Sequence, residues 1–195
     1  PVTKADIKAA KALLKTGTSG QMCSAARTLV ENGNSADAIK FLGTALGNAD
    51  RPFRNAVLGY VTQKAGVPQV ANLLVKKFPK LTEEAKTDAI NWLGNNKISN
   101  ALNLIIPETA KSGELGSTAI SAIGKIGGDK ALTTLVSLLS RGGDKGADAL
   151  AALKSFDGKV APAVLEALAG DKYNSGLLQL ASEKHMTGAF QNIFD

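Results

Sequence analysis

A short apolar motif recurs along the chain at intervals of about 30 residues. Its clearest copies are Ala-Ile-Asn-Trp-Leu-Gly at 89–94, Ala-Ile-Ser-Ala-Ile-Gly at 119–124 and Ala-Leu-Ala-Ala-Leu-Lys at 149–154. Weaker copies begin at Ala25, Ala56 and Gly176. Repetition with a period of roughly 20–50 residues indicates stacked units, each of which buries its apolar face against the next.

Each period predicts two helices. The first carries the motif, and the second follows a short break, at 35–46, 67–77, 98–111, 129–140 and 159–169. Within 129–140, Ala131, Leu132, Leu135 and Leu139 follow the spacing of a helix with one buried face. Ala and Leu are strong helix formers, and no alternating apolar pattern indicates a strand. The sequence therefore predicts an all-α fold.

Two similar glycine turns separate predicted helices. Gly-Gly-Asp-Lys occurs at 127–130 and again at 142–145. The run at 123–128 is similar to the glycine turn of a KH nucleic-acid-binding domain, but no flanking strands are predicted. Because the turn recurs, we interpret each copy as a left-handed stop followed by an N-cap, Asp129 or Asp144.

The prolines agree with this helical interpretation. Pro52, Pro68 and Pro162 fall in the first turns of predicted helices, where the missing N–H costs nothing. Pro107 lies inside the predicted helix at 98–111. It is expected to kink or end that helix near Ile106.

Composition excludes several classes of site. Cys23 is the only cysteine and His185 the only histidine, so an intramolecular disulfide, a cysteine-rich zinc site and a histidine cluster are excluded. We expect Cys23 to be a buried, unreactive thiol. No apolar stretch is long enough to span a bilayer, and no catalytic pair of carboxylates is evident. We therefore expect no cofactor, no metal and no enzymatic activity.

The net charge of +6 is unevenly distributed. Residues 1–97 hold 14 Lys and Arg against 7 Asp and Glu, whereas residues 98–195 hold 9 against 10. A basic half is compatible with an anionic partner, although it also favours solubility. The predicted partner-binding candidates in this half are Arg51, Arg54, Lys76, Lys77 and Lys80.

Other polar and aromatic groups in this half have structural interpretations. Lys4, Lys8, Lys11 and Lys15 form one stripe, which we interpret as the solvated face of a capping helix. The acidic turn of Glu83, Glu84 and Asp88 suits a helix N-terminus. Tyr60 and Trp92 occupy equivalent repeat positions and are predicted to be core residues.

These features resemble HEAT repeats, and in particular the short bacterial type, also called PBS-lyase-like. The resemblance is carried by the Ala-Ile/Leu-x-x-Leu/Ile-Gly core and the Gly-Asp-Lys-Ala-x-x-x-Leu continuation. It is strongest over 85–170 and weaker toward both ends. The Arg that is usual in the family's first helix is missing here.

The resemblance implies one right-handed α-α superhelix over 1–195, a HEAT- or armadillo-like solenoid of about six helix pairs. The pairs would start near 20, 52, 83, 114, 144 and 172. First helices would form the convex face, and second helices the concave face that such solenoids usually use for binding. The tail at 187–195 is predicted to be half a repeat, and either it caps the stack or the chain is cut before a following domain.

The resemblance implies a non-catalytic scaffold that binds a protein partner or an adjacent domain, and we expect a monomer. One alternative is an accessory module of a larger secreted bacterial enzyme. Another is a basic HEAT-like DNA-binding protein, although lysine dominates arginine and only one Trp is present. A bilin lyase ranks last, because no chromophore site is evident.

The ends of the chain bear on these alternatives. It begins with Pro1 rather than Met, so we expect that something preceded it. The alternative that the chain is a fragment of a larger protein therefore stays open. The compartment is not identified, and an extracytoplasmic location ranks ahead of the cytoplasm.

Overall fold

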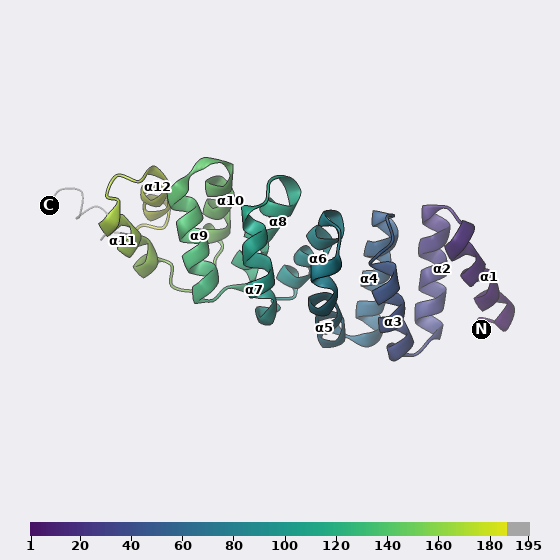
Figure 1. Ribbon diagram of the computed structural model, residues 1–195. Helices are drawn as coiled ribbons and strands as arrows, with labels where there is room; N and C mark the ends of the chain where they lie inside the picture. Colours follow the sequence, from purple (N-terminus) through teal and green to yellow (C-terminus); the bar gives the residue numbers. More distant parts are fainter. Residues whose placement is uncertain (187–195) are drawn as a thin grey trace. The chain divides into compact units, whose positions relative to one another are not determined.

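The computed structural model describes residues 1–186, and this part of the chain is helical without strands (Figure 1). An all-α fold is thus confirmed. The α-helices are α1 (Lys4–Thr16), α2 (Ser19–Asn32), α3 (Ser35–Ala45), α4 (Arg51–Ala65), α5 (Val67–Lys77), α6 (Glu83–Asn95), α7 (Leu102–Ile105), α8 (Gly113–Ile126), α9 (Asp129–Arg141), α10 (Gly143–Lys154), α11 (Ala161–Gly170) and α12 (Ser175–Glu183). The short 3-10 helices are η1 (Phe78–Lys80), η2 (Ser99–Ala101) and η3 (Ile106–Ala110).

Contacts divide the chain into two compact units, Pro1–Ala89 and Ile90–Asp195, and the boundary falls within α6. The prediction of a single solenoid domain stays a prediction. The predicted half-repeat at 187–195 lies outside the described residues.

Observed helices match the expected ranges within a few residues. Second helices were expected at 35–46, 67–77, 129–140 and 159–169, and the structure has α3, α5, α9 and α11 there. The prolines at 52, 68 and 162 stand in first turns, as predicted. The helix expected at 98–111 is instead three short pieces, η2, α7 and η3. The break at Ile106 follows from Pro107, as predicted.

The glycine turns differ from the prediction in one respect. Gly127 and Gly142 end their helices with positive φ, as expected. The N-caps that follow are glycines, Gly128 for α9 and Gly142 for α10, and neither helix has a side-chain cap. Asp129 and Asp144 therefore are not N-caps. They lie inside the first turn, where a carboxylate is favoured by the helix dipole.

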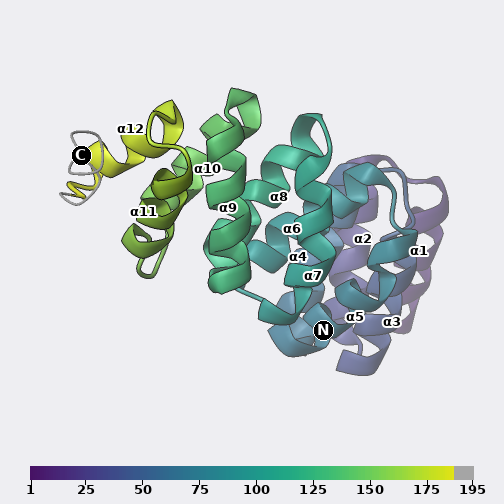
Figure 2. The same cartoon turned by 60° about the vertical axis from the view of Figure 1, so that its left-hand side comes forward.

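In the first unit the helices form two layers. The first helices α2 and α4 contact each other, and the second helices α3 and α5 also contact each other and lie side by side in Figure 2. Helix α1 packs on α2, and α3 packs on α4. Leu42, Val57 and Leu74, from α3, α4 and α5, are fully buried between the layers.

The second unit repeats this two-layer arrangement. Helix α8 contacts α10, and α10 contacts α12, while α9 contacts α11 in the other layer. The last glycine of the repeat motif explains the close approach of first helices. A Cβ added to Gly94 would lie 2.7 Å from the Cβ of Ala122, and one added to Gly124 would lie 2.9 Å from that of Ala152. The motif thus ends in Gly where the next first helix leaves no room for a side chain.

Candidate functional site

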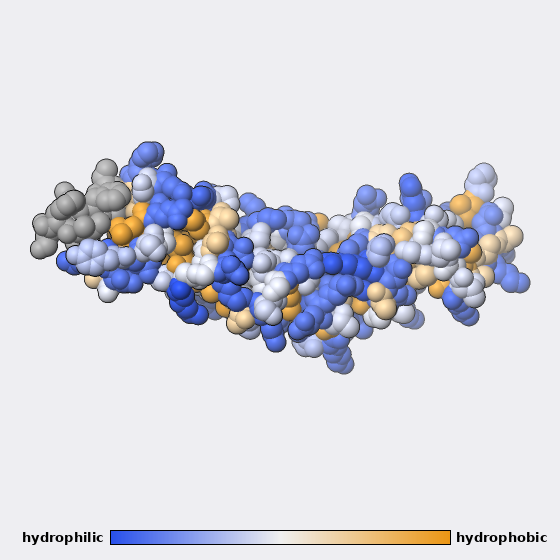
Figure 3. Space-filling model, turned by 90° about the horizontal axis from the view of Figure 1, so that it is seen from above, coloured by the Kyte–Doolittle hydropathy of each residue, from blue (hydrophilic) through white to orange (hydrophobic). Residues whose placement is uncertain are grey.

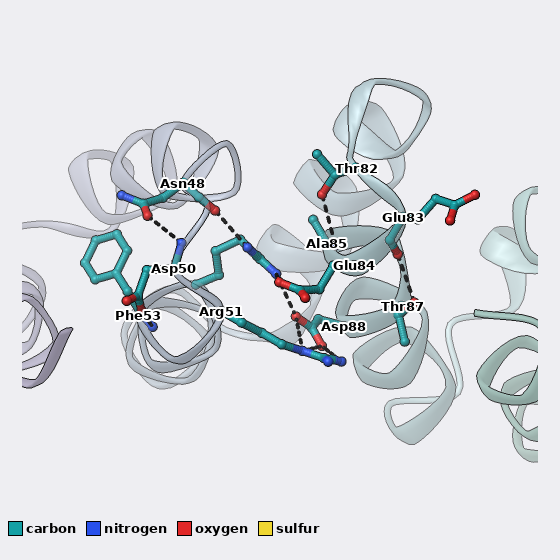
Figure 4. A network of polar contacts seen from close by, with 11 residues as sticks. Asn48, Asp50, Arg51, Phe53, Thr82, Glu83, Glu84, Ala85, Thr87 and Asp88 are labelled. Atoms are coloured by element: carbon teal, nitrogen blue, oxygen red, sulfur yellow. Dashed lines mark hydrogen bonds and ion pairs between the residues drawn. The ribbon is translucent and has the colours of Figure 1, made fainter. Parts of the chain in front are cut away.

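Arg51 and Arg54, two predicted partner-binding residues, lie in an ion-pair network inside the first unit (Figure 4). The N-cap Asp50 and Pro52 start α4, so both arginines stand in its first turn. Arg54 Nη2 donates to Glu84 Oε1 at 2.8 Å and to Asp88 Oδ2 at 3.3 Å. Arg54 Nη1 donates to the carbonyl oxygen of Asn48 at 2.8 Å.

Burial decides what each arginine of this network can offer. Arg54 is only 3% exposed, and its guanidinium is committed to the first turn of α6. The Arg51 side chain is 33% exposed, and its Nη2 donates to Asp88 Oδ1 at 2.8 Å. Arg54 thus has little surface for a partner, whereas Arg51 keeps an accessible edge. The binding role of both residues stays a prediction.

The acidic turn at 83–88 has a role that sequence reasoning missed. Glu84 and Asp88 of α6 form ion pairs with Arg51 and Arg54 of α4, whereas the sequence suggested only a helix-dipole effect. A signal was present, since the acidic residues follow the arginines by about one repeat period. The network ties α4 to the first turn of α6.

Lys76, Lys77 and Lys80, the other predicted candidates, lie at the end of α5 and in η1. Lys76 and Lys80 are exposed, and Lys77 is half-buried. The stem of Lys77 lies over Gly43 of α3, whose added Cβ would be 3.6 Å from Lys77 Cε. These lysines therefore belong to the second-helix layer, apart from the Arg51–Arg54 network.

Formal charge divides sharply between the two layers of the first unit. The second-helix layer, defined here as α1, α3, α5 and η1, carries eight lysines and two aspartates. The first-helix layer, which comprises α2, α4 with its cap Asp50, and α6 to Ala89, carries five basic and five acidic residues. Its arginines are paired, with Arg27 bonded to Glu31 at 2.7 Å. All the positive excess of this unit therefore lies on the second-helix layer, and half of its lysines are on α1.

The lysines of the second-helix layer are also unpaired. Among residues 1–186, none of their eight ammonium groups forms an ion pair or a side-chain hydrogen bond. Their members are Lys4, Lys8, Lys11, Lys15, Lys40, Lys76, Lys77 and Lys80. Such like charges repel one another, so an anionic partner would relieve an unfavourable interaction.

A groove opens between α1 and α3, which both pack on α2. Its cavity volume is about 470 Å³. Half-buried Ile7, Leu29 and Phe41 provide apolar lining, and Phe41 is held edge-on against Phe53, with ring centroids 6.3 Å apart. Lys11 and Asp37 stand at its rim. We name this the α1–α3 groove. Figure 3 shows apolar surface among hydrophilic residues at the α1 end of the face that it draws.

A second groove lies between η3 and α9 in the other unit, with a cavity volume of about 540 Å³. Its lining is rich in hydroxyls, from Thr109, Thr133, Thr134 and Ser137. The cations at its edge are already engaged. Arg141 Nη2 donates to Ser137 Oγ at 2.9 Å, and Lys145 Nζ donates to the carbonyl oxygens of Thr109 and Lys111. This groove thus offers hydroxyl groups and two cations that are already hydrogen-bonded within the chain.

Grooves between first helices are smaller in both units. The one between α2 and α4 has about 260 Å³, and the one between α8 and α10 has about 220 Å³. Side-chain contacts also close this layer, since Ser19 donates to Asp50 at 2.9 Å and Ser117 donates to Asp148 at 2.8 Å. In both units the groove beside second helices is thus larger than the groove between first helices.

No alternative chemical centre emerges in the described residues. Cys23 is half-buried in α2 rather than fully buried as predicted. Burial and, to a lesser extent, the Asp50 carboxylate raise the pKa of its thiol, which favours the unreactive protonated form. His185 is exposed in the turn after α12. Within residues 1–186, no three His, Cys, Asp or Glu side chains are placed to hold a metal ion.

The two aromatic residues that were predicted to be core residues are only half-buried. Tyr60 in α4 and Trp92 in α6 each keep part of their ring accessible. Tyr60 lines the small groove between α2 and α4. Neither ring stands in the larger α1–α3 or η3–α9 groove.

In the part of the chain from 1 to 186, every helix is too short or too polar to cross a bilayer. A scan against protein-family models and a search of curated proteins find no match to this sequence.

Proposed function

We propose that the chain is a HEAT-like solenoid of helix pairs that binds a protein partner through its second helices, without catalysis of its own. The two-layer arrangement within each unit supports this architecture. The resemblance of the repeat motif and the 30-residue spacing point the same way. In such solenoids the extended face of second helices is available to partners.

The observation that carries the proposal is the difference between the layers. First helices approach so closely that Gly94 and Gly124 leave no space for a Cβ, and ion pairs tie α4 to α6. Second helices leave grooves of about 470 and 540 Å³, roughly twice the volume of those between first helices. Concave sites with mixed apolar and polar lining are where ligands bind.

A matched pair of variants tests this proposal in an extract of the cells that produce the protein. The first variant carries Asn72→Arg and Thr133→Arg, on exposed positions of α5 and α9. The second carries Gln63→Arg and Ser121→Arg, on exposed positions of α4 and α8. Affinity capture should retain a partner with wild type and the second variant, and lose it with the first. Retention by the first variant and loss by the second would contradict the proposal.

A further inference from the structure

We propose that the α1–α3 groove binds an acidic amphipathic segment of a partner protein. The inference rests on the proposed function, because it assigns a chemistry to one part of the second-helix layer. It goes beyond that function by naming the groove, the residues and the class of ligand. Three observations carry it: an apolar floor, a cationic rim and the absence of internal partners for that rim.

The floor of the groove is built to take an apolar side chain. Val30 and Ala38, each 2% exposed, close it from below, while Ile7, Leu29 and Phe41 remain half-buried. Only two large apolar side chains are classed as exposed in the described chain, and one of them, Val2, lies in the adjoining cavity beside Lys4 and Ile7. Apolar surface that stays accessible beside a preformed cavity is typical of recognition by helix or peptide insertion.

The rim of the groove is cationic along α1. Lys4 and Lys11 are exposed and flank Ile7 by one turn on either side, and Lys8 lies on the same stripe. Asp6 is the acidic residue of this helix, and its carboxylate is bound to Thr3 N and Thr3 Oγ1, both at 2.7 Å. On the opposite wall Asp37 is the one carboxylate that lines the groove. The carboxylates of a ligand should therefore face α1 and avoid Asp37.

Lysine chemistry favours a polypeptide over a nucleic acid. All eight basic residues of this layer are lysines, whereas arginine provides the planar fork that grips phosphate. The groove has one aromatic ring, Phe41, and that ring packs against Phe53. Stacking platforms for bases are thus lacking among the lining residues. Flexible ammonium groups around an apolar floor suit Asp and Glu flanking Leu- or Phe-like anchors.

A random 16-residue peptide library displayed on phage and selected on the whole chain tests this inference. The selected peptides should combine Asp or Glu with apolar residues at helical spacing. Their affinity should fall by about tenfold for Lys4→Glu with Lys11→Glu. It should also fall as salt rises from about 50 to 500 mM. Asp37→Asn, which removes the opposing carboxylate, should tighten binding.

The matched control is Lys76→Glu with Lys80→Glu, which makes the same charge change in the same layer but outside the groove. An equal loss of peptide affinity in both double variants would overturn the assignment of the groove, because it would mean that the peptides bind the basic face without a defined site. If the selected peptides bind the Lys4→Glu, Lys11→Glu variant as tightly as wild type, and the control variant as well, this inference is overturned while the proposed function survives. If no peptide is enriched but an oligo-dT strand binds in a salt-dependent manner, both proposals fail.

Discussion

At the scale of single residues, Arg54 joins the start of α4 to the first turn of α6. It is 3% exposed and paired with Glu84 and Asp88, although its place in a basic helix start had made it a candidate for partner binding. Burial of an arginine depends on side chains about 30 residues away, which local patterns do not show. Ile7 and Phe41 were missed as groove residues for the same reason, since apolar spacing predicts burial and not an opening.

Arg54 gives a prediction at this scale. Arg54→Ala would leave Glu84 and Asp88 without its guanidinium, and the Asn48 carbonyl without a donor. Removing one partner of a buried pair typically costs about 3–5 kcal/mol. Because Asp88 keeps its ion pair with Arg51 and the Glu84 side chain is half exposed, we expect the free energy of unfolding to fall by about 3 kcal/mol. Chemical denaturation would measure this loss in the free energy of unfolding.

Arg27→Ala is the control for that measurement. The Arg27–Glu31 pair is a single-helix contact with both side chains more than half exposed. Its removal should leave stability nearly unchanged. A comparable loss for both variants would mean that the Arg51–Arg54 network is no stronger than a surface pair.

At the scale of elements, most helices could be predicted because apolar periodicity and breakers act locally. Helix α9 was expected at 129–140 and occupies Asp129–Arg141, and Pro107 broke the helix where expected. The predicted N-caps of α9 and α10 were wrong, because two glycines in succession place the N-cap one residue before Asp129 and two residues before Asp144. The layers could not be derived from one period alone, since they depend on contacts between repeats.

The motif glycine gives the prediction at this scale. Gly94→Ala would place a Cβ 2.7 Å from the Cβ and 2.8 Å from the Cα of Ala122, so the backbone of α8 would have to shift. Overpacking of this kind costs about 1–3 kcal/mol. We expect a net loss of about 2 kcal/mol in the free energy of unfolding, to be measured by denaturation.

Gly59→Ala is the matched control, because Gly59 lies inside α4 with no atom within 4 Å of an added Cβ. It should stabilise the protein by about 1 kcal/mol, since Ala is the better helix former. Stabilisation by both substitutions would show that successive first helices are not held as closely as the glycine motif requires.

At the scale of the whole molecule, the two layers have different tasks in our proposal. Close glycine contacts and ion pairs hold first helices together, whereas second helices keep larger grooves and unpaired lysines. The sequence placed the positive charge in the first half of the chain. It could not show that this excess lies on one layer, because α1, α3 and α5 are separated in sequence by the helices that they cover.

Site-specific photo-cross-linking of partners in cell extract tests the central claim most directly. A photoreactive side chain is placed at Asn72 or Thr133 on second helices, and at Gln63 or Ser121 on first helices, all exposed. Our account predicts that a protein partner is cross-linked from the second-helix positions and not from the first-helix positions. Cross-links confined to Gln63 and Ser121, or none from any of the four, would contradict it.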